Sequence, residues 1–214
     1  MISEDTAMEV WKKALSYIAE EGKEFIDQNN RICKQVLNLT LEIRRPDLKL
    51  TEPIELLNSF KTWKYPKMDE IANIMMSSKL SLDYAYSYGP RIFNYQGQKN
   101  QIDDFIIPLM KKSPTTRRAI AVLWDPLSDS DLIKSEVPGL IYLDFKIVEN
   151  KLHMTGTIRS NDMFFGWPAN IYQLFVLQNY VRKKLDVEIG SLTVFSVSAH
   201  VFKEEFEMIK KIIE

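Results

Sequence analysis

The chain has 214 residues, of which 45% are hydrophobic and 27% are charged, and its 28 basic and 29 acidic residues leave a formal net charge of −1. These proportions are those of an ordinary globular chain, so they exclude disordered and fibrous proteins, and the length suits one large domain. The near-neutral charge disfavours a protein whose main task is to bind nucleic acid, because any basic site must be local.

The sequence predicts a soluble protein of the cytoplasm. Its first residues lack the basic segment and apolar core of a secretory signal. No apolar stretch reaches the ~18 uninterrupted residues that a membrane span requires, so no membrane role is expected. The single cysteine, Cys33, excludes an internal disulfide and suits a reducing compartment. Since only two histidines accompany it, we expect no metal site.

The N-terminal region is predicted to form a helix and then a strand. Thr6 and Glu9 have the spacing of a capping box, and apolar residues at three-to-four spacing continue the helix to Gly22. Residues 37–43 alternate apolar and polar side chains, which predicts a half-buried strand. The apolar side chains expected on its inner face are Leu37, Leu39, Leu41 and Ile43.

The middle of the chain is predicted to be helical. Two short helices are expected at residues 53–62 and 67–78, and a third at residues 101–112, where Pro108 should kink the helix or cut it short. Beyond Pro114 the sequence becomes rich in strand-forming residues.

The C-terminal half is predicted to mix strands with two helices. Strands are expected at residues 119–124, 141–147 and 151–159, with a turn at Glu149 and Asn150, and a further strand begins at residue 192. Pro168 opens a strong helix, and residues 203–213 form a terminal amphipathic helix. Regular βαβ alternation and a Gly-x-Gly-x-x-Gly motif are both missing from the sequence, which disfavours a dinucleotide-binding fold. We therefore predict one α+β domain over residues 1–214.

The densest polar cluster in an apolar context is Arg159-Ser160-Asn161-Asp162, followed by Phe165-Gly166-Trp167-Pro168-Ala169-Asn170. It joins the end of a strand to the start of a buried helix, whose unsatisfied N–H groups favour an anion or a carbonyl oxygen. A structural alternative is that Asp162 and Asn170 are helix caps and that Arg159 forms a salt bridge at the rim.

A second cluster is Thr116-Arg117-Arg118, directly before an apolar strand. Arginine is suited to bidentate recognition of phosphate, and both arginines could act from a loop. A solvated surface pair is the alternative interpretation.

Together these segments resemble thymidylate synthases. Four segments occur in the order and approximate spacing of that family and are most similar to its short archaeal-type branch. They are Arg117 to Trp124, residues 159–162, residues 166–170 and Ser198 to Phe202. Arg31 to Asn38 adds a weaker match. The resemblance implies an α+β fold with a twisted β-sheet flanked by helices, in which one sheet face forms a homodimer.

The resemblance also implies a site for a pyrimidine nucleoside monophosphate, dUMP. Arg159 resembles the family arginine that binds the 5′-phosphate from its own subunit, and Ser160 resembles the serine beside it. Arg117 and Arg118 resemble the pair that reaches the same phosphate from the other subunit. Arg31 matches a fourth phosphate-binding arginine in poorer surroundings.

Four further residues match the pyrimidine and ribose contacts of the family. Asp162 resembles the aspartate that lines the pyrimidine site, and Tyr88 the tyrosine that assists proton removal from C5. Asn170 resembles the asparagine that pairs with the O4/N3 edge of uracil, since an amide can donate to O4 and accept from N3–H. His200 resembles the histidine that binds the ribose 3′-hydroxyl. The one-carbon donor implied is a reduced folate or another tetrahydropterin.

Two positions depart from the family pattern. Gly139 stands where the family has its nucleophilic cysteine, whose thiolate adds to uracil C6 and makes C5 reactive. Cys33, the remaining thiol, is expected in a helix-to-strand connection and is interpreted as structural. Phe202 replaces a tyrosine whose hydroxyl helps to hold the ribose, which removes a hydrogen bond worth about 0.5–1.5 kcal/mol.

Three functions remain open from the sequence. The first is an enzyme that acts on a uracil nucleotide without the usual thiolate. The second is a catalytically inactive nucleotide-binding protein, or a subunit that completes a partner's active site. The third is a conventional thymidylate synthase in which Gly139 is a variant of the cysteine.

Overall fold

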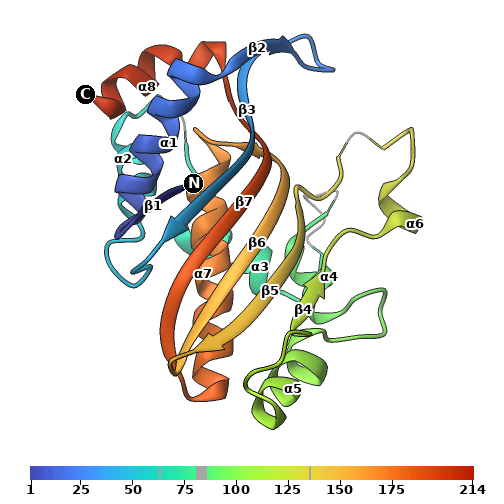
Figure 1. The fold of residues 1–214 in the computed structure, drawn as a ribbon. Coiled ribbons are helices and arrows are strands. Elements are labelled where there is room, and N and C mark those ends of the chain that lie inside the picture. The colour runs from blue at the N-terminus through green and yellow to red at the C-terminus, as the bar shows by residue number, and fades with distance from the viewer. Residues whose placement is uncertain (63, 81–85, 135) are drawn as a thin grey trace.

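The computed structural model describes residues 1–62, 64–80, 86–134 and 136–214. In this part of the chain, seven strands form one mixed sheet in the order β1–β3–β7–β6–β5–β4, with β2 paired to β3 beside this path (Figure 1). β1 pairs with β3 and β6 pairs with β7 in parallel, and the other pairs are antiparallel. The strands are β1 (Ile2–Glu4), β2 (Lys23–Ile26), β3 (Ile32–Ile43), β4 (Ile120–Val122), β5 (Leu140–Val148), β6 (Lys151–Asp162) and β7 (Glu188–Phe202).

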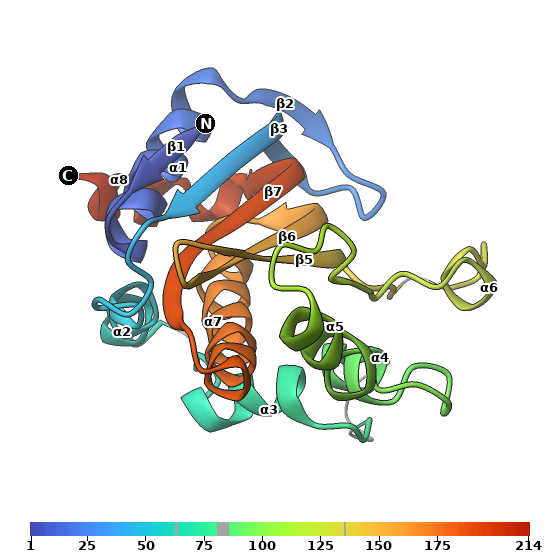
Figure 2. The same ribbon diagram turned by 60° about the horizontal axis from the view of Figure 1, so that its bottom comes forward.

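Most of the helices gather on one face of this sheet, while α6 projects to its side, as Figures 1 and 2 both show. They are α1 (Ala7–Glu21), α2 (Glu52–Ser59), α3 (Met68–Met76), α4 (Tyr88–Phe93), α5 (Ile107–Lys112), α6 (Pro126–Asp129), α7 (Gly166–Leu185) and α8 (Phe206–Ile213), with a π-helical turn at Ile102–Ile106 and a 3-10 turn at Lys203–Glu205. This arrangement confirms the predicted α+β class. No helix in the described residues is long and apolar enough to cross a lipid bilayer.

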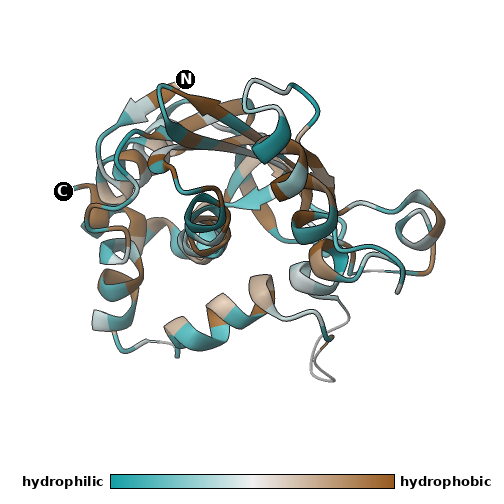
Figure 3. Cartoon of the chain, turned by 90° about the horizontal axis from the view of Figure 1, so that it is seen from below, coloured by the Kyte–Doolittle hydropathy of each residue, from teal (hydrophilic) through white to brown (hydrophobic). Residues whose placement is uncertain are grey.

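The core lies between the sheet and α7, which Figure 3 shows end-on beneath the strands. The predicted apolar face of α7 is buried, since Ile171, Leu174, Leu177 and Val181 are each at most 2% exposed. Full burial of such a side chain contributes about 1.5–3 kcal/mol, so this stripe fixes which way α7 faces. The orientation of α7 in turn determines where Asn170 points.

α1 begins with the predicted capping box and is fixed to the segment that leads into α7. The Thr6 hydroxyl accepts the Glu9 N–H (3.3 Å), while the Glu9 carboxylate accepts the Thr6 N–H (3.0 Å). Trp11 is fully buried, and its indole N–H donates to the Met163 carbonyl oxygen (2.6 Å). Since Met163 directly follows β6, α1 supports one wall of the polar cluster predicted from the sequence.

β3 differs from its prediction in length and in the orientation of its first apolar residue. Leu39 is 4% exposed on the inner face, but Leu37 is 59% exposed. The cause is Asn38, whose φ of 58° lies in the left-handed region and interrupts the regular alternation between the two residues. Cys33 lies within β3, where it is 1% exposed, so its predicted place in a connection is wrong.

Pro108 neither breaks nor ends its helix. The chain stays helical from Ile102 to Lys112, because the first turn widens into a π-helix in which the Ile106 N–H donates to the Gln101 carbonyl oxygen (3.0 Å). The missing proline N–H is accommodated at the start of α5. The predicted turn at Glu149 and Asn150 is confirmed, and both residues have positive φ angles, 50° and 60°.

Candidate functional site

The ends of β5 and β6 bring Gly139, Arg159 and Tyr88 together. The Arg159 backbone N–H donates to the Gly139 carbonyl oxygen (2.9 Å). A Cβ atom at position 139 would lie 3.4 Å from the Ser160 carbonyl oxygen and 3.7 Å from the Tyr88 hydroxyl, both ordinary contacts. A side chain therefore fits at position 139, and it would face Tyr88.

The Arg159 guanidinium is held in place by the segment before β5. Its Nε donates to the Pro138 carbonyl oxygen (3.0 Å) and its Nη2 to the Val137 carbonyl oxygen (3.0 Å). The guanidinium carbon lies 5.8 Å from the centre of the Trp124 ring. A guanidinium has five N–H donors, so the remaining ones are available to an anion from a group that is already oriented.

Tyr88 begins α4 with its side chain 8% exposed. Burial raises the pKa of its phenol well above the ordinary value of 10.0. The hydroxyl therefore stays protonated at neutral pH, where it can donate one hydrogen bond and accept others.

Neither Asp162 nor Asn170 is the N-cap of α7, which is Phe165, so the structural alternative of two helix caps is wrong. The Asp162 carboxylate accepts the N–H groups of Phe164 and Phe165 (both 3.0 Å) in the turn before the helix. Asn170 is the fifth residue of α7 and caps no helix end, because its Nδ2 donates to the Asn161 side-chain oxygen (3.3 Å).

His200 lies beside Asp162 at the same end of the sheet. The two residues are register partners in the parallel pairing of β6 and β7. Burial lowers the pKa of His200 and is opposed by the Asp162 carboxylate, while burial raises the pKa of Asp162. We take the imidazole as neutral, which suits a hydrogen bond to an uncharged hydroxyl.

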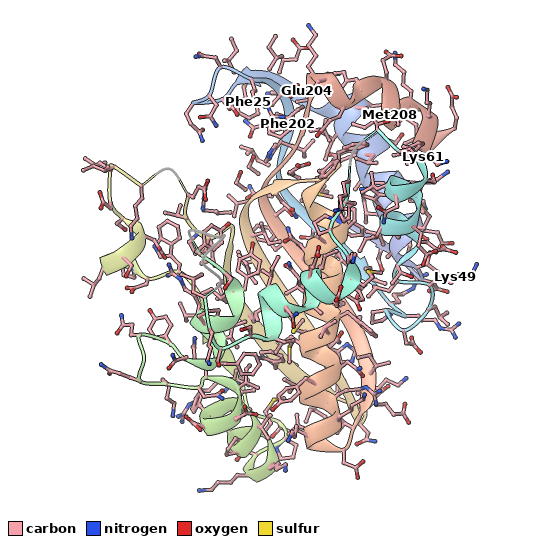
Figure 4. All side chains as sticks on the ribbon, turned by 180° about the vertical axis from the view of Figure 1, so that it is seen from behind. Phe25, Lys49, Lys61, Phe202, Glu204 and Met208 are labelled. Atoms are coloured by element: carbon pink, nitrogen blue, oxygen red, sulfur yellow. The ribbon has the colours of Figure 1, made fainter. Side chains whose placement is uncertain are left out.

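Arg31 lies in the turn between β2 and β3 and is already paired with an acid. Its Nη2 is 2.6 Å from Glu204 Oε1, and its guanidinium carbon is 3.2 Å from the centre of the Phe202 ring. Figure 4 shows Phe202 and Glu204 together at this end of the molecule. The Phe202 ring is 5.2 Å from the ring of His200, the residue predicted to bind the ribose, so Arg31 lies near that site. Some of the Arg31 N–H groups already donate to Glu204.

Arg117 and Arg118 lie on the segment that enters β4, and both are exposed. Within the described residues their side chains form no ion pair or hydrogen bond with Arg159, Asn170 or Tyr88. β4 is the edge strand of the sheet, separated from β6 by β5. Their charges are therefore presented outward rather than toward the site of their own chain.

Three buried polar residues near Asn170 were given no role from the sequence, although Asn161 lies in the predicted polar cluster. Asn161 is 1% exposed, and its Nδ2 donates to the Ser196 hydroxyl oxygen (2.9 Å), which is fully buried. Gln173 is 4% exposed, and within the described residues its Oε1 has no hydrogen-bond partner. A usable signal was Ser196, a polar residue at an inward position of the alternating pattern with Leu192 and Val194.

Gln173 lines a small gap between α7, α4 and the start of β5 that has no room for a water molecule. Tyr88 and Asn170 line it as well, with apolar side chains from Met75, Leu140, Ile158 and Leu174. A larger groove of about 710 Å³ lies at the opposite end of the sheet, among residues that include Arg45, Lys151 and Arg182. None of the residues predicted for the nucleotide site lines that groove.

Comparisons with known proteins agree with the resemblance in the sequence. The family model described as thymidylate synthase matches residues 48–214. A Methanosarcina mazei protein named "Putative thymidylate synthase" is 34% identical over 96% of this chain and 91% of its own length. A Methanosarcina barkeri protein of the same name is 32% identical over 98% of this chain and 92% of its own length. Thymidylate synthase 1 of Bacillus spizizenii is 28% identical over 59% of this chain and 45% of its own length.

Proposed function

The chain belongs to the thymidylate synthase family, and from this premise we propose that it binds a uracil nucleotide, dUMP, in the site around Arg159, Asn170 and Tyr88. The observation that supports this most is the held guanidinium of Arg159, next to the position where the family has its nucleophile. An oriented, half-buried guanidinium with free donors suits a phosphate dianion.

Each matched residue has a chemical role in this proposal. Arg159 binds the 5′-phosphate, with Ser160 beside it, and Asn170 pairs with the O4/N3 edge of uracil. Neutral His200 contacts the ribose 3′-hydroxyl, and the protonated Tyr88 hydroxyl assists the removal of the proton from C5. Asp162 shapes the pyrimidine site mainly through the turn that it caps.

We propose that a second copy of the chain completes the phosphate site. In the described residues no helix covers the outer face of the sheet, where Leu37, Tyr142 and Val197 are 59%, 38% and 38% exposed. Burying such a face against its own copy gives a twofold dimer. Arg117 and Arg118, which have no partner in their own site, would then supply charge to the neighbouring phosphate.

The chemistry after binding cannot start from position 139, because glycine has no group that adds to uracil C6. Cys33 is a poor substitute, since burial raises the pKa of its thiol and it lies in β3. We therefore propose one-carbon transfer to C5 without the usual thiolate, in which the C5–H bond breaks and its proton is released as the new C5–carbon bond forms. A reduced folate or another tetrahydropterin would supply the carbon.

A second candidate function is nucleotide binding without catalysis. Gly139 favours it, because the residues matched to the phosphate and base contacts are present while glycine stands at the position matched to the nucleophile. The third candidate is a conventional thymidylate synthase in which glycine replaces the cysteine at position 139. The space around Gly139 for a side chain is consistent with this candidate. Release of the C5 hydrogen from dUMP by the chain as it stands would identify the catalytic function.

The phosphate contact is tested by comparing dUMP with deoxyuridine, which lacks the phosphate. We expect Arg159→Ala to weaken dUMP binding roughly 10- to 100-fold and to leave deoxyuridine binding nearly unchanged, because charge-assisted hydrogen bonds contribute about 1.5–3 kcal/mol. Isothermal titration calorimetry measures both. Arg182→Ala, at the far end of α7, is the matched control and should bind like the wild type. Equal dUMP binding by wild type and Arg159→Ala would remove the proposed site.

A further inference from the structure

We propose that Arg91 and Asp129 are positioning residues for the phosphate site. Their ion pair holds the backbone on both sides of Trp124, and the Trp124 ring in turn restricts the Arg159 guanidinium. Both residues act through the phosphate contact assigned above to Arg159, so this role rests on the proposed function.

The ion pair between Arg91 and Asp129 is bidentate and largely buried. Arg91 Nη1 donates to Asp129 Oδ2 (2.6 Å), and Arg91 Nη2 donates to Asp129 Oδ1 (2.7 Å). The exposed fractions of the two side chains are 19% and 2%. Paired hydrogen bonds between a guanidinium and a carboxylate fix the relative orientation of both groups. The pair therefore joins α4, which carries Arg91, to α6, which ends at Asp129.

The same two side chains hold the peptide groups on either side of Trp124. Arg91 Nη1 also donates to the Leu123 carbonyl oxygen (3.1 Å), and Asp129 Oδ2 also accepts the Asp125 N–H (2.9 Å). Leu123 and Asp125 are the immediate neighbours of Trp124, just beyond the end of β4. The ion pair therefore determines the path of the backbone at Trp124 after the chain has left the sheet.

The Trp124 side chain connects this ion pair to the phosphate site. The centre of its ring lies 5.8 Å from the Arg159 guanidinium carbon. An aromatic ring attracts a cation through its face and uses none of the N–H donors of the cation. The ring thus restricts the guanidinium and leaves its free donors to a phosphate. Because a group that is ordered before the ligand arrives loses less entropy on binding, a fixed Trp124 ring raises the affinity for the phosphate.

The experiment measures dissociation constants for dUMP and deoxyuridine by titration calorimetry. The ratio of the deoxyuridine constant to the dUMP constant isolates the contribution of the phosphate. The main variant is the double substitution Arg91→Met and Asp129→Leu, because apolar residues in place of a buried ion pair leave no unpaired charge. We expect the ratio to fall about three- to tenfold. The fall should be smaller than for Arg159→Ala, since the two carbonyl oxygens that accept from Arg159 remain.

A second comparison tests whether the ion pair acts through Trp124. Trp124→Leu alone should lower the ratio by a similar factor. Adding the double substitution at Arg91 and Asp129 to Trp124→Leu should lower the ratio no further, because the ring through which the pair acts is already gone. Two independent effects would instead multiply.

Gln178→Leu is the matched control for a loss of stability. Gln178 is fully buried in α7, and its Nε2 donates to the Leu152 carbonyl oxygen (2.8 Å), so its loss should lower the melting temperature and leave the ratio unchanged. If the double variant does not fold, Arg91→Lys replaces it. Lysine keeps the charge of the pair but loses the paired hydrogen bonds, so the ratio should fall in the same direction.

An unchanged ratio in a folded double variant or in Arg91→Lys, beside a lowered ratio in Arg159→Ala, overturns the positioning role and leaves the nucleotide site intact. Multiplying effects, or an unchanged ratio in Trp124→Leu, overturn it as well, because the influence would not pass through the ring. A wild type that binds dUMP no better than deoxyuridine overturns the proposed phosphate contact instead, and the role of the ion pair with it.

Discussion

Gly139 occupies the position before β5 where a Cβ atom would contact the Ser160 carbonyl oxygen and approach the Tyr88 hydroxyl. No contact closer than 3.4 Å opposes a side chain there. The glycine is therefore not required by close packing, and a side chain at this position would face the Tyr88 hydroxyl.

We predict that Gly139→Cys forms a covalent adduct with 5-fluoro-dUMP in the presence of a reduced folate or pterin donor. The new thiol would lie next to the bound pyrimidine, and intact-protein mass spectrometry detects the added mass. If the chain binds the nucleotide without catalysis, the wild type should release tritium from [5-³H]dUMP on the order of 10⁶ times more slowly than an enzyme with its nucleophile, whereas one-carbon transfer to C5 requires measurable release. Synthase-like release by the wild type would show that position 139 does not limit the chemistry. An unmodified Gly139→Cys variant that still binds dUMP would show that the pocket has changed beyond this residue.

Among the elements, the junction of β7 and α8 places several carboxylates close together. Glu205 lies in the 3-10 turn, where its Oε2 accepts the Phe202 N–H (2.9 Å). Burial, together with the carboxylates of Asp162 and Glu204, raises the pKa of Glu205 from 4.5 to about 8, and Arg31 opposes the shift. The folded chain thus retains a proton that the unfolded chain loses.

The sign of the pH effect follows from this difference in proton binding. The stabilisation due to protonated Glu205 is complete below pH 4.5 and is lost as the pH rises to about 8. Glu205→Gln stays neutral and can still accept the Phe202 N–H. Its melting temperature relative to the wild type should therefore rise between pH 4.5 and 8.5, by roughly 2–4 °C per kcal/mol at this chain length. A difference in melting temperature that is independent of pH would contradict the raised pKa.

At the scale of the whole molecule, the sheet has one face covered by helices and one face with exposed apolar residues. We predict that Val197→Arg, at the centre of the outer face, gives a monomer in sedimentation and weakens dUMP binding. A buried unpaired charge opposes the pairing of two copies, and the loss of the partner removes Arg117 and Arg118 from each phosphate. Tyr17→Arg is the control, because Tyr17 is 42% exposed on α1. A monomeric wild type, or a monomeric variant with full affinity, would exclude the shared site.

Local rules explain why much of the fold could be predicted from the sequence. The capping box at Thr6, the turn at Glu149 and the apolar stripe of α7 depend on residues close together in the chain, so their patterns determine their structures. The family motifs likewise identified Arg159 and Asn170 before any distance was known. β1 and β2 were missed because they are only three and four residues long and are formed by pairing with β3.

The sequence by itself determined the α+β class, the family and the set of chemical groups, because composition, periodicity and motif order are properties of the chain alone. Only the tertiary structure decided how those groups are oriented. The positive φ of Asn38 leaves the Leu37 side chain exposed. Arg31 pairs with Glu204 just beyond the end of β7, and the Asn161 side chain forms hydrogen bonds with both Ser196 and Asn170. Such contacts join residues from different elements, and their directions follow from the pairing of strands and the packing of helices.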